Sequence, residues 1–255
     1  MTADPDRLGS IAWAARTGGR LTGAETRALL PQLARTHTHN AAGRIAMALR
    51  LHSGRRTQLP ERALRTPSSP LTRTAEQVAR ERLTPALLQH SYRCFRYGAA
   101  LAALEDIDVD TELLFAAAML HDTGLVHPTP GVDFTLSSAR IALDVAETVG
   151  LSSTATETMR SAITLHHTPG VTLADGAEAY LLSAAAGVDV VGFRRWKLPD
   201  SFVEQVLAEH PRLSFKDEFR ARWVAEAAAV PEGRARLLRR SGAFDLAIAL
   251  APYSQ

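Results

Sequence analysis

The sequence has little cysteine, little lysine and no long hydrophobic run. Its single cysteine, Cys94, excludes an internal disulfide and suits a reducing compartment. Apolar runs stay shorter than the roughly 18 residues that a membrane helix needs, and the N-terminal stretch MTADPDRLGS contains no basic-then-apolar export signal. These absences predict a cytoplasmic protein that does not span a membrane.

A strong excess of positive or negative charge is also missing. The chain has 29 basic and 27 acidic residues, which gives a formal net charge of +2. Arginine pairs such as Arg55-Arg56 and Arg239-Arg240 are separated by acidic residues, which is typical of solvated surfaces. Because no strong field surrounds the chain, we expect neither nucleic-acid nor membrane binding. A small-molecule substrate is expected instead, and homo-oligomer formation is left open.

Strand patterns are absent, whereas helix start and stop signals recur. No stretch of strand length alternates apolar and polar residues. Thr22 and Glu25 form a capping-box pair, and Thr84 followed by Pro85 supplies an N-cap and an N1 proline. With 255 residues, 46% of them hydrophobic, the chain can bury one sizeable core, and we predict an all-α fold. Further helix starts are expected at Asp110 or Thr111, Ser153, Asp175, Ser201 (paired with Glu204) and Ser214 (paired with Asp217).

The N-terminal part differs in composition from the rest. Residues 53–75 are rich in Arg, Pro, Ser and Thr, which indicates a linker or an irregular surface arm. Residues 7–52 are expected to form two or three helices that cover the main domain or contact a second subunit. The predicted division is therefore an N-terminal helical extension with its linker, 1–75, and a helical domain, 76–255.

Four candidate metal ligands stand in helical stretches: His90, the adjacent pair His121 and Asp122, and Asp189. A divalent cation with one position open for water accepts this mixture of imidazole and carboxylate. The adjacent pair ends an apolar helix, and Asp189 is a lone acid among apolar residues, so burial would be costly without a partner. The alternatives are a buried core histidine at His90, a helix C-cap at the pair, and a salt bridge from Asp189 to an arginine.

The order of these residues resembles the HD-domain superfamily of metal-dependent hydrolases. The stretches HSYRCFRYG and LLFAAAMLHDTGL are most similar to its cyanamide-hydratase-like branch. Within this resemblance His90 matches the first histidine, His121 and Asp122 the doublet, and Asp189 the distal aspartate. The resemblance covers about 84–225 and implies a compact helical bundle in which a metal-activated water performs catalysis, with Asp122 as both ligand and catalytic residue.

Two further histidines and one arginine are candidates for contact with the substrate. His166 and His167 end a helix before a Pro-Gly pair, and we expect His166 to face the cavity as a catalytic proton donor and His167 to bind substrate. The alternative is that both interact with the helix C-terminus. Arg93, one turn beyond His90, is expected to contact substrate or the doublet aspartate. His127 is a less favoured candidate for a histidine that faces the site.

The expected cofactor is one divalent metal ion, Zn, with Fe, Mn or Ni as alternatives. The doublet is followed by Gly124 and Leu125 rather than by the Gly-Lys of many phosphohydrolases, which makes phosphoesters less attractive. Small residues near Asp189 suggest a tight pocket. We therefore favour a hydratase, either hydrolase or lyase, that adds water to a small nitrile, cyanamide or related carbon–nitrogen compound. The alternatives are a phosphohydrolase acting on a nucleotide or another ester, a di-iron oxygenase, and a non-catalytic helical binding protein.

Overall fold

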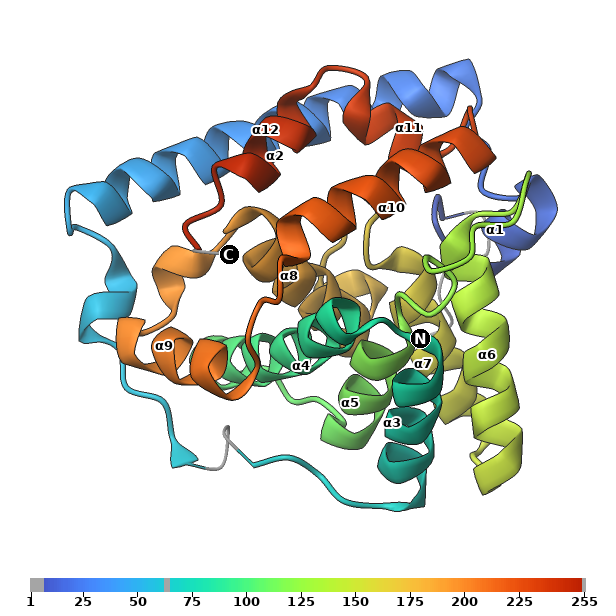
Figure 1. The fold of residues 1–255 in the computed structure, drawn as a ribbon, viewed down its shortest axis with the longest axis horizontal. Coiled ribbons are helices and arrows are strands. Elements are labelled where there is room, and N and C mark those ends of the chain that lie inside the picture. Colours follow the sequence, from blue (N-terminus) through green and yellow to red (C-terminus); the bar gives the residue numbers. More distant parts are fainter. Residues whose placement is uncertain (1–6, 62–64, 254–255) are drawn as a thin grey trace.

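The computed structural model describes residues 7–61 and 65–253. Over these ranges the chain forms twelve α-helices and short 3-10 turns with no β-strand, which confirms the all-α prediction (Figure 1). Among the described helices, none has both the length and the apolar character that crossing a membrane requires.

Five helices form the centre of the molecule: α4 (Pro85–Glu105), α5 (Thr111–Leu120), α6 (Phe134–Val149), α7 (Ser153–Leu165) and α8 (Ala177–Val191). Every residue of α5 from Leu113 to Leu120 is buried, since α5 packs against helices on all sides. Helices α4 and α8 pack closely along each other, and α4 begins with the predicted Thr84 cap and N1 proline. This packing brings the C-terminal ends of α5 and α7 next to the N-terminal part of α4.

Helix α3 (Pro70–Arg82) begins inside the segment predicted to be irregular, so that prediction was wrong for its C-terminal part. Ser69 caps the helix and the N1 proline follows it, but the Arg- and Thr-rich composition hid the pattern. A 3-10 turn, η1 (Ser53–Arg56), lies earlier in the segment, and residues 62–64 lie outside the described residues. The core-facing side chains of α3 are small or short, namely Leu71, Thr72, Ala75 and Ala79.

The N-terminal extension forms two helices, α1 (Ile11–Thr17) and α2 (Gly23–Ala48), as predicted. The capping box of Thr22 and Glu25 at the start of α2 is present. Helix α2 runs along one side of the molecule beside the C-terminal helices α10 (Phe215–Ala229), α11 (Arg234–Arg239) and α12 (Ala243–Ala249) (Figure 1). The Arg44 guanidinium of α2 donates a hydrogen bond to the carbonyl of Leu250. The extension therefore covers the main domain.

Several predicted caps were wrong in detail. Ser152 rather than Ser153 caps α7, and α8 follows Gly176 after the 3-10 turn η3 (Leu173–Asp175). Helix α9 (Asp200–Glu209) begins after Pro199, so Ser201 lies inside the helix. Ser214 precedes α10 with a φ of 62°, whereas a capping serine needs an extended backbone to reach the helix amides. Tertiary packing sets these starts.

Candidate metal centre

Three histidines from three helices meet at the floor of a cavity. His90 lies in the second turn of α4, and His121 and His166 are the C-terminal cap residues of α5 and α7. All three side chains are buried, with His121 fully inaccessible. Since α5 and α7 both end at this point, their last side chains project beyond the apolar packing and toward α4.

The ring orientation of each histidine is set by a hydrogen bond at Nδ1. The Nδ1 atom of His121 lies 2.8 Å from the carbonyl of Ala118, and that of His166 lies 2.7 Å from the carbonyl of Ile163. The Nδ1 atom of His90 lies 2.7 Å from Asp189 Oδ2. Because these oxygens accept hydrogen bonds, each Nδ1 carries a proton, and in a neutral ring this leaves the lone pair at Nε2.

Asp122 lies among these three lone pairs. Its Oδ2 is 3.5 Å from His90 Nε2 and 3.4 Å from His121 Nε2, and its Oδ1 is 3.7 Å from His166 Nε2. The Nε2 atoms of His90 and His121 are only 3.3 Å apart. Asp122 Oδ2 is buried and has no hydrogen-bond donor in the described part of the chain.

These contacts fit a divalent cation. A buried carboxylate that has no hydrogen-bond donor is unfavourable, and so are imidazole lone pairs that face one another. A positive charge between these groups removes both penalties. Among the described residues, His121, Asp122 and His166 offer ligand atoms within 4.8 Å of one another, and His90 and Cys94 do so with His121. Burial lowers the pKa of His121, and burial together with the neighbouring histidines lowers the pKa of His166 well below its usual value. Both rings are therefore neutral, as ligands require.

Asp189 lies behind His90, and its contacts differ from those expected of a ligand. Arg93 Nε and Nη2 donate to Oδ1 and Oδ2 at 2.8 and 2.9 Å, and Arg212 Nη1 donates to Oδ1 at 2.9 Å. Burial would raise the pKa of Asp189, but these guanidinium groups and His90 hold it well below its ordinary value. Its carboxylate faces Nδ1 of His90 rather than the Nε2 side. In this geometry Asp189 orients His90, and its role as a direct metal ligand stays a prediction.

Arg93 does not reach the cavity, in contrast to the predicted contact with substrate. Its side chain is fully buried, and Nη1 donates to the carbonyls of His210 and Pro211 at 3.1 and 3.0 Å. Within the described part of the chain its other hydrogen bonds go to Asp189, so the Arg93 guanidinium makes structural contacts. Arg212, which completes this ion pair, had no local signal in the sequence because its partner lies 23 residues away.

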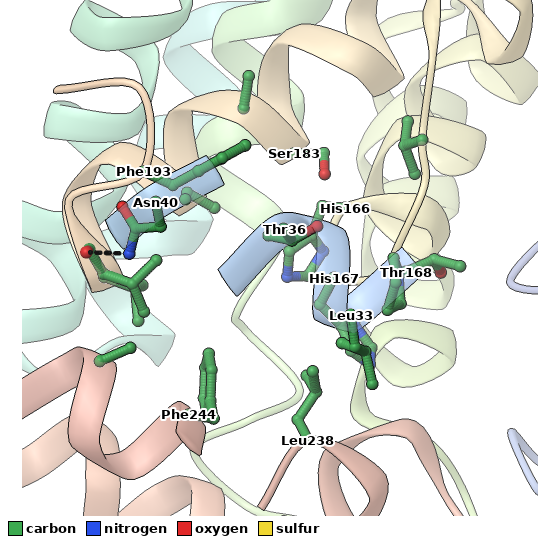
Figure 2. Close-up of a pocket in the computed structure, with 18 of the residues that line it drawn as sticks. Leu33, Thr36, Asn40, His166, His167, Thr168, Ser183, Phe193, Leu238 and Phe244 are labelled. Carbon is green, nitrogen blue, oxygen red and sulfur yellow. Dashed lines mark hydrogen bonds between the residues drawn. The ribbon is translucent and has the colours of Figure 1, made fainter. Parts of the chain in front are cut away.

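The cavity above the histidines has a volume of about 610 Å³, so the expectation of a tight pocket was wrong. Figure 2 shows side chains of α2 on the cavity wall, with Thr36 and Leu33 near His166 and His167 and Asn40 farther away, beside Phe193. The small residues of α8 that suggested tightness, among them Ser183 and Gly187, line the cavity and leave it open. His127 is exposed and does not line it.

His167 lies in the cavity wall next to His166. Its ring stacks on Phe134 with centroids 5.0 Å apart, and Nε2 is 3.9 Å from Asp133 Oδ2. Both ring nitrogens are buried without a hydrogen-bond partner in the described part of the chain. Burial, with Arg234 nearby, lowers the pKa of His167 well below its usual value, so the ring is neutral. This placement is compatible with the predicted substrate contact, which stays a prediction.

Residues 87–215, about half of the chain, match the family model of the HD domain. The chain is an HD-domain protein. Members of this family are generally metal-dependent hydrolases, and the matched range contains all four of the predicted ligands. No curated protein is similar enough to this HD-domain protein to count as a match. Helix α2 and the C-terminal helices that cover the cavity lie outside the matched residues, apart from the first residue of α10.

Proposed function

We propose that this HD-domain protein is a metal-dependent hydratase or hydrolase that adds water to a carbon–nitrogen group of a small molecule. The observation that supports this proposal most is the convergence of neutral imidazoles and one carboxylate on the floor of a cavity without an unpaired interior cation. Addition of water to a nitrile, cyanamide or related group needs a metal ion that polarises the carbon–nitrogen bond and a group that accepts the proton of the water. The substrate itself needs no counter-charge. The same cavity is poorly suited to a phosphoester.

The arginines of the site argue against the phosphohydrolase alternative. Arg93 and Arg212 converge on Asp189 behind the histidines. Among the described residues that line the cavity, the arginines are Arg35 and Arg194. The Arg35 side chain is exposed. Arg194 donates to the hydroxyl of Tyr180 and lies 3.5 Å from Glu105. Recognition of a phosphate usually uses arginine or lysine groups directed at the ligand, and among the described lining residues only the exposed Arg35 is available for this role.

The proposed roles follow from the tautomers. His90, His121 and Asp122 hold one divalent ion, for which zinc suits the donor set. Such an ion lowers the pKa of a water molecule toward about 7 and polarises the group under attack. His166, anchored through its Nδ1, would accept the proton of the attacking water at Nε2 and then donate it to the substrate nitrogen, so it would act first as a base and then as the proton donor predicted from the sequence. His167 offers a hydrogen bond to the substrate.

One ion is preferred over two because both groups of close donor atoms among the described residues share His121. A di-iron centre would need a second, separate group of ligands. The proposed single ion also leaves Cys94 without a catalytic role, and burial raises the pKa of its thiol well above the usual value.

The test combines elemental analysis with product detection. The purified protein is expected to contain one divalent ion per chain and to release amide or urea products from a panel of nitriles and cyanamides. His121→Ala should abolish both, whereas the matched control His127→Ala, an exposed histidine outside the cavity, should retain both. Phosphate release from nucleotides or other esters, without amide or urea formation, would contradict the proposal.

A further inference from the structure

The mouth of the cavity, where lining residues of α2 such as Arg35 and His39 are exposed, has an excess of positive charge. The Arg35 guanidinium has no ion pair or hydrogen bond with another described residue. Among the described residues that line the cavity, Asp122 is the only carboxylate, and it lies on the floor. Just outside the lining, Asp175 is paired with Arg7 at 2.7 Å and so adds no net negative charge. The charge of Arg35 therefore has no counter-charge at the mouth.

A second arginine, Arg194, follows α8 and lines the same cavity. Its guanidinium lies 4.8 Å from the centre of the Tyr180 ring and 5.5 Å from that of the Phe193 ring. Its charge is only partly balanced, because Arg194 Nη1 and Lys197 Nζ lie 3.5 and 2.8 Å from the same oxygen, Glu105 Oε1. One carboxylate is thus shared by two cations, which leaves a net positive charge in this group.

Contacts between α2 and the end of α8 bring the two arginines to the same cavity. His39, one turn after Arg35 on α2, packs against Phe193 with ring centroids 5.7 Å apart. Arg194 follows Phe193 directly in the chain and lies over its ring. An anionic group at the mouth would therefore be attracted from the α2 side and from the α8 side.

Two hydroxyls on the cavity wall also have no partner. Thr36 of α2 and Ser183 of α8 line the cavity, and neither hydroxyl has a hydrogen bond with another described residue. Both residues are partly exposed, and neither oxygen is among the buried atoms that lack a partner, so a ligand can reach them. Figure 2 shows Thr36 near His166 and Ser183 above it, with Phe193 to the left. A ligand that extends from the mouth to the histidines would meet these hydroxyls.

The C-terminal helices supply an apolar part of the same wall. Phe219 and Trp223 of α10, Leu238 of α11 and Phe244 of α12 line the cavity. The volume of about 610 Å³ is in the range of pockets that enclose drug-sized ligands. A ligand that fits this mixed wall has an apolar body in addition to its polar groups.

We propose that the substrate carries one carboxylate, which binds Arg35 at the mouth in the field of Arg194, while its reacting group lies at the histidines. A guanidinium donates charge-assisted hydrogen bonds to a carboxylate, and a single negative charge matches the one lining arginine that has no partner. The carboxylate takes no part in the reaction. Arg35 is thus a specificity-determining residue from outside the matched HD segment. Only the nature of the reacting group rests on the proposed function.

The test measures binding by calorimetry, without turnover. The probes are benzamides that carry a propanoate, a propanol or a propylammonium chain at the para position. The propanoate is expected to bind at least about fivefold more tightly than the propanol, because only the carboxylate pairs with Arg35. The propylammonium compound should bind most weakly. Raising the salt concentration from about 0.05 M to about 0.5 M should reduce these differences, since the mouth is open to solvent.

Two variants and a chelator show which group binds the carboxylate. Arg35→Gln should remove most of the difference between propanoate and propanol. The matched control Arg27→Gln, an exposed arginine of α2 outside the lining, should keep it. Removal of metal by a chelator should also keep it, because the carboxylate binds Arg35 rather than the ion.

Three results would overturn the proposal. The first is equal affinity of propanoate and propanol for the wild-type protein, a comparison that needs no variant. The second is an unchanged ratio in Arg35→Gln, and the third is a ratio that disappears after chelation, which would mean that the carboxylate binds the ion. If the ratio behaves as expected while no carbon–nitrogen compound is hydrated, the proposed reaction fails and the carboxylate site stands.

Discussion

Glu226 makes the stability of this protein depend on pH in a direction opposite to that of most paired carboxylates. It is a buried residue of α10 whose Oε1 accepts from the backbone N–H of Phe134 at 3.1 Å, while Oε2 has no partner in the described part of the chain. Burial, with the negative charge of Asp133 nearby, raises the pKa of Glu226 from 4.5 to about 8. The carboxyl is therefore protonated in the folded protein at neutral pH.

The sign of the effect follows from proton uptake on folding. Between pH 4.5 and about 8, Glu226 has lost its proton in the unfolded chain but keeps it in the folded protein. Stability therefore falls as pH rises through this interval. At about 1.4 kcal/mol per pH unit, the full interval amounts to about 5 kcal/mol, and about 3 kcal/mol is lost by pH 7. Below pH 4.5 the group contributes no penalty.

The substitution Glu226→Gln mimics the protonated form at every pH. Urea unfolding followed by circular dichroism should give equal free energies of unfolding for wild type and variant near pH 4.5. The variant should then become more stable by about 1.4 kcal/mol per pH unit up to about pH 8. The matched control is Glu232→Gln, which changes an exposed carboxyl in the same region and should leave the profile unchanged. Parallel profiles of wild type and Glu226→Gln between pH 5 and 8 would refute the reasoning.

Four further substitutions test the site and the fold around it. His121→Ala should remove the bound ion in elemental analysis, and full retention would contradict its ligand role. His166→Ala should keep the ion but lower kcat about 10²- to 10⁴-fold, so loss of the ion would instead make it a ligand. Asp189→Asn should weaken metal binding about 10- to 100-fold in chelator competition, whereas an unchanged affinity would exclude its effect on His90. Gly124→Ala should cost about 1–3 kcal/mol in thermal unfolding, because its Cβ would lie 2.2 Å from the Phe134 carbonyl. An unchanged melting temperature would contradict that contact.

Local signals in the sequence predicted those parts of the fold that depend on neighbouring residues. The capping box before α2 and the Thr84 cap of α4 were correct because each forms within three or four residues. The predicted Ser214 cap failed because the turn before α10 gives that residue a positive φ. The start of helix α3 was missed because the Arg- and Thr-rich composition of its segment hid the Ser69 cap and the N1 proline.

The same distinction applies to the candidate site. Residue types and their helical context were enough to bring His90, His121 and Asp122 together as a predicted donor set. The contacts of Asp189 involve Arg93 and Arg212, which are 96 and 23 residues away in the sequence. A local sequence pattern cannot predict contacts over such separations. Arg35 was not predicted as a site residue either, since the packing of α2 against the end of α8 joins residues 151 positions apart.

The covering of the cavity by α2 and by α11 and α12 has a consequence for biosynthesis. Helix α2 is made before the matched HD segment and α11 and α12 are made after it, so the enclosure can be completed only after α12 has been made. A nascent chain that stops after α10 would already contain His90, His121 and His166, but it would lack the part of the cavity wall that Leu238, Phe244 and Ala247 supply. The matched HD segment can thus fold before the cavity has the complete wall that selects its ligand.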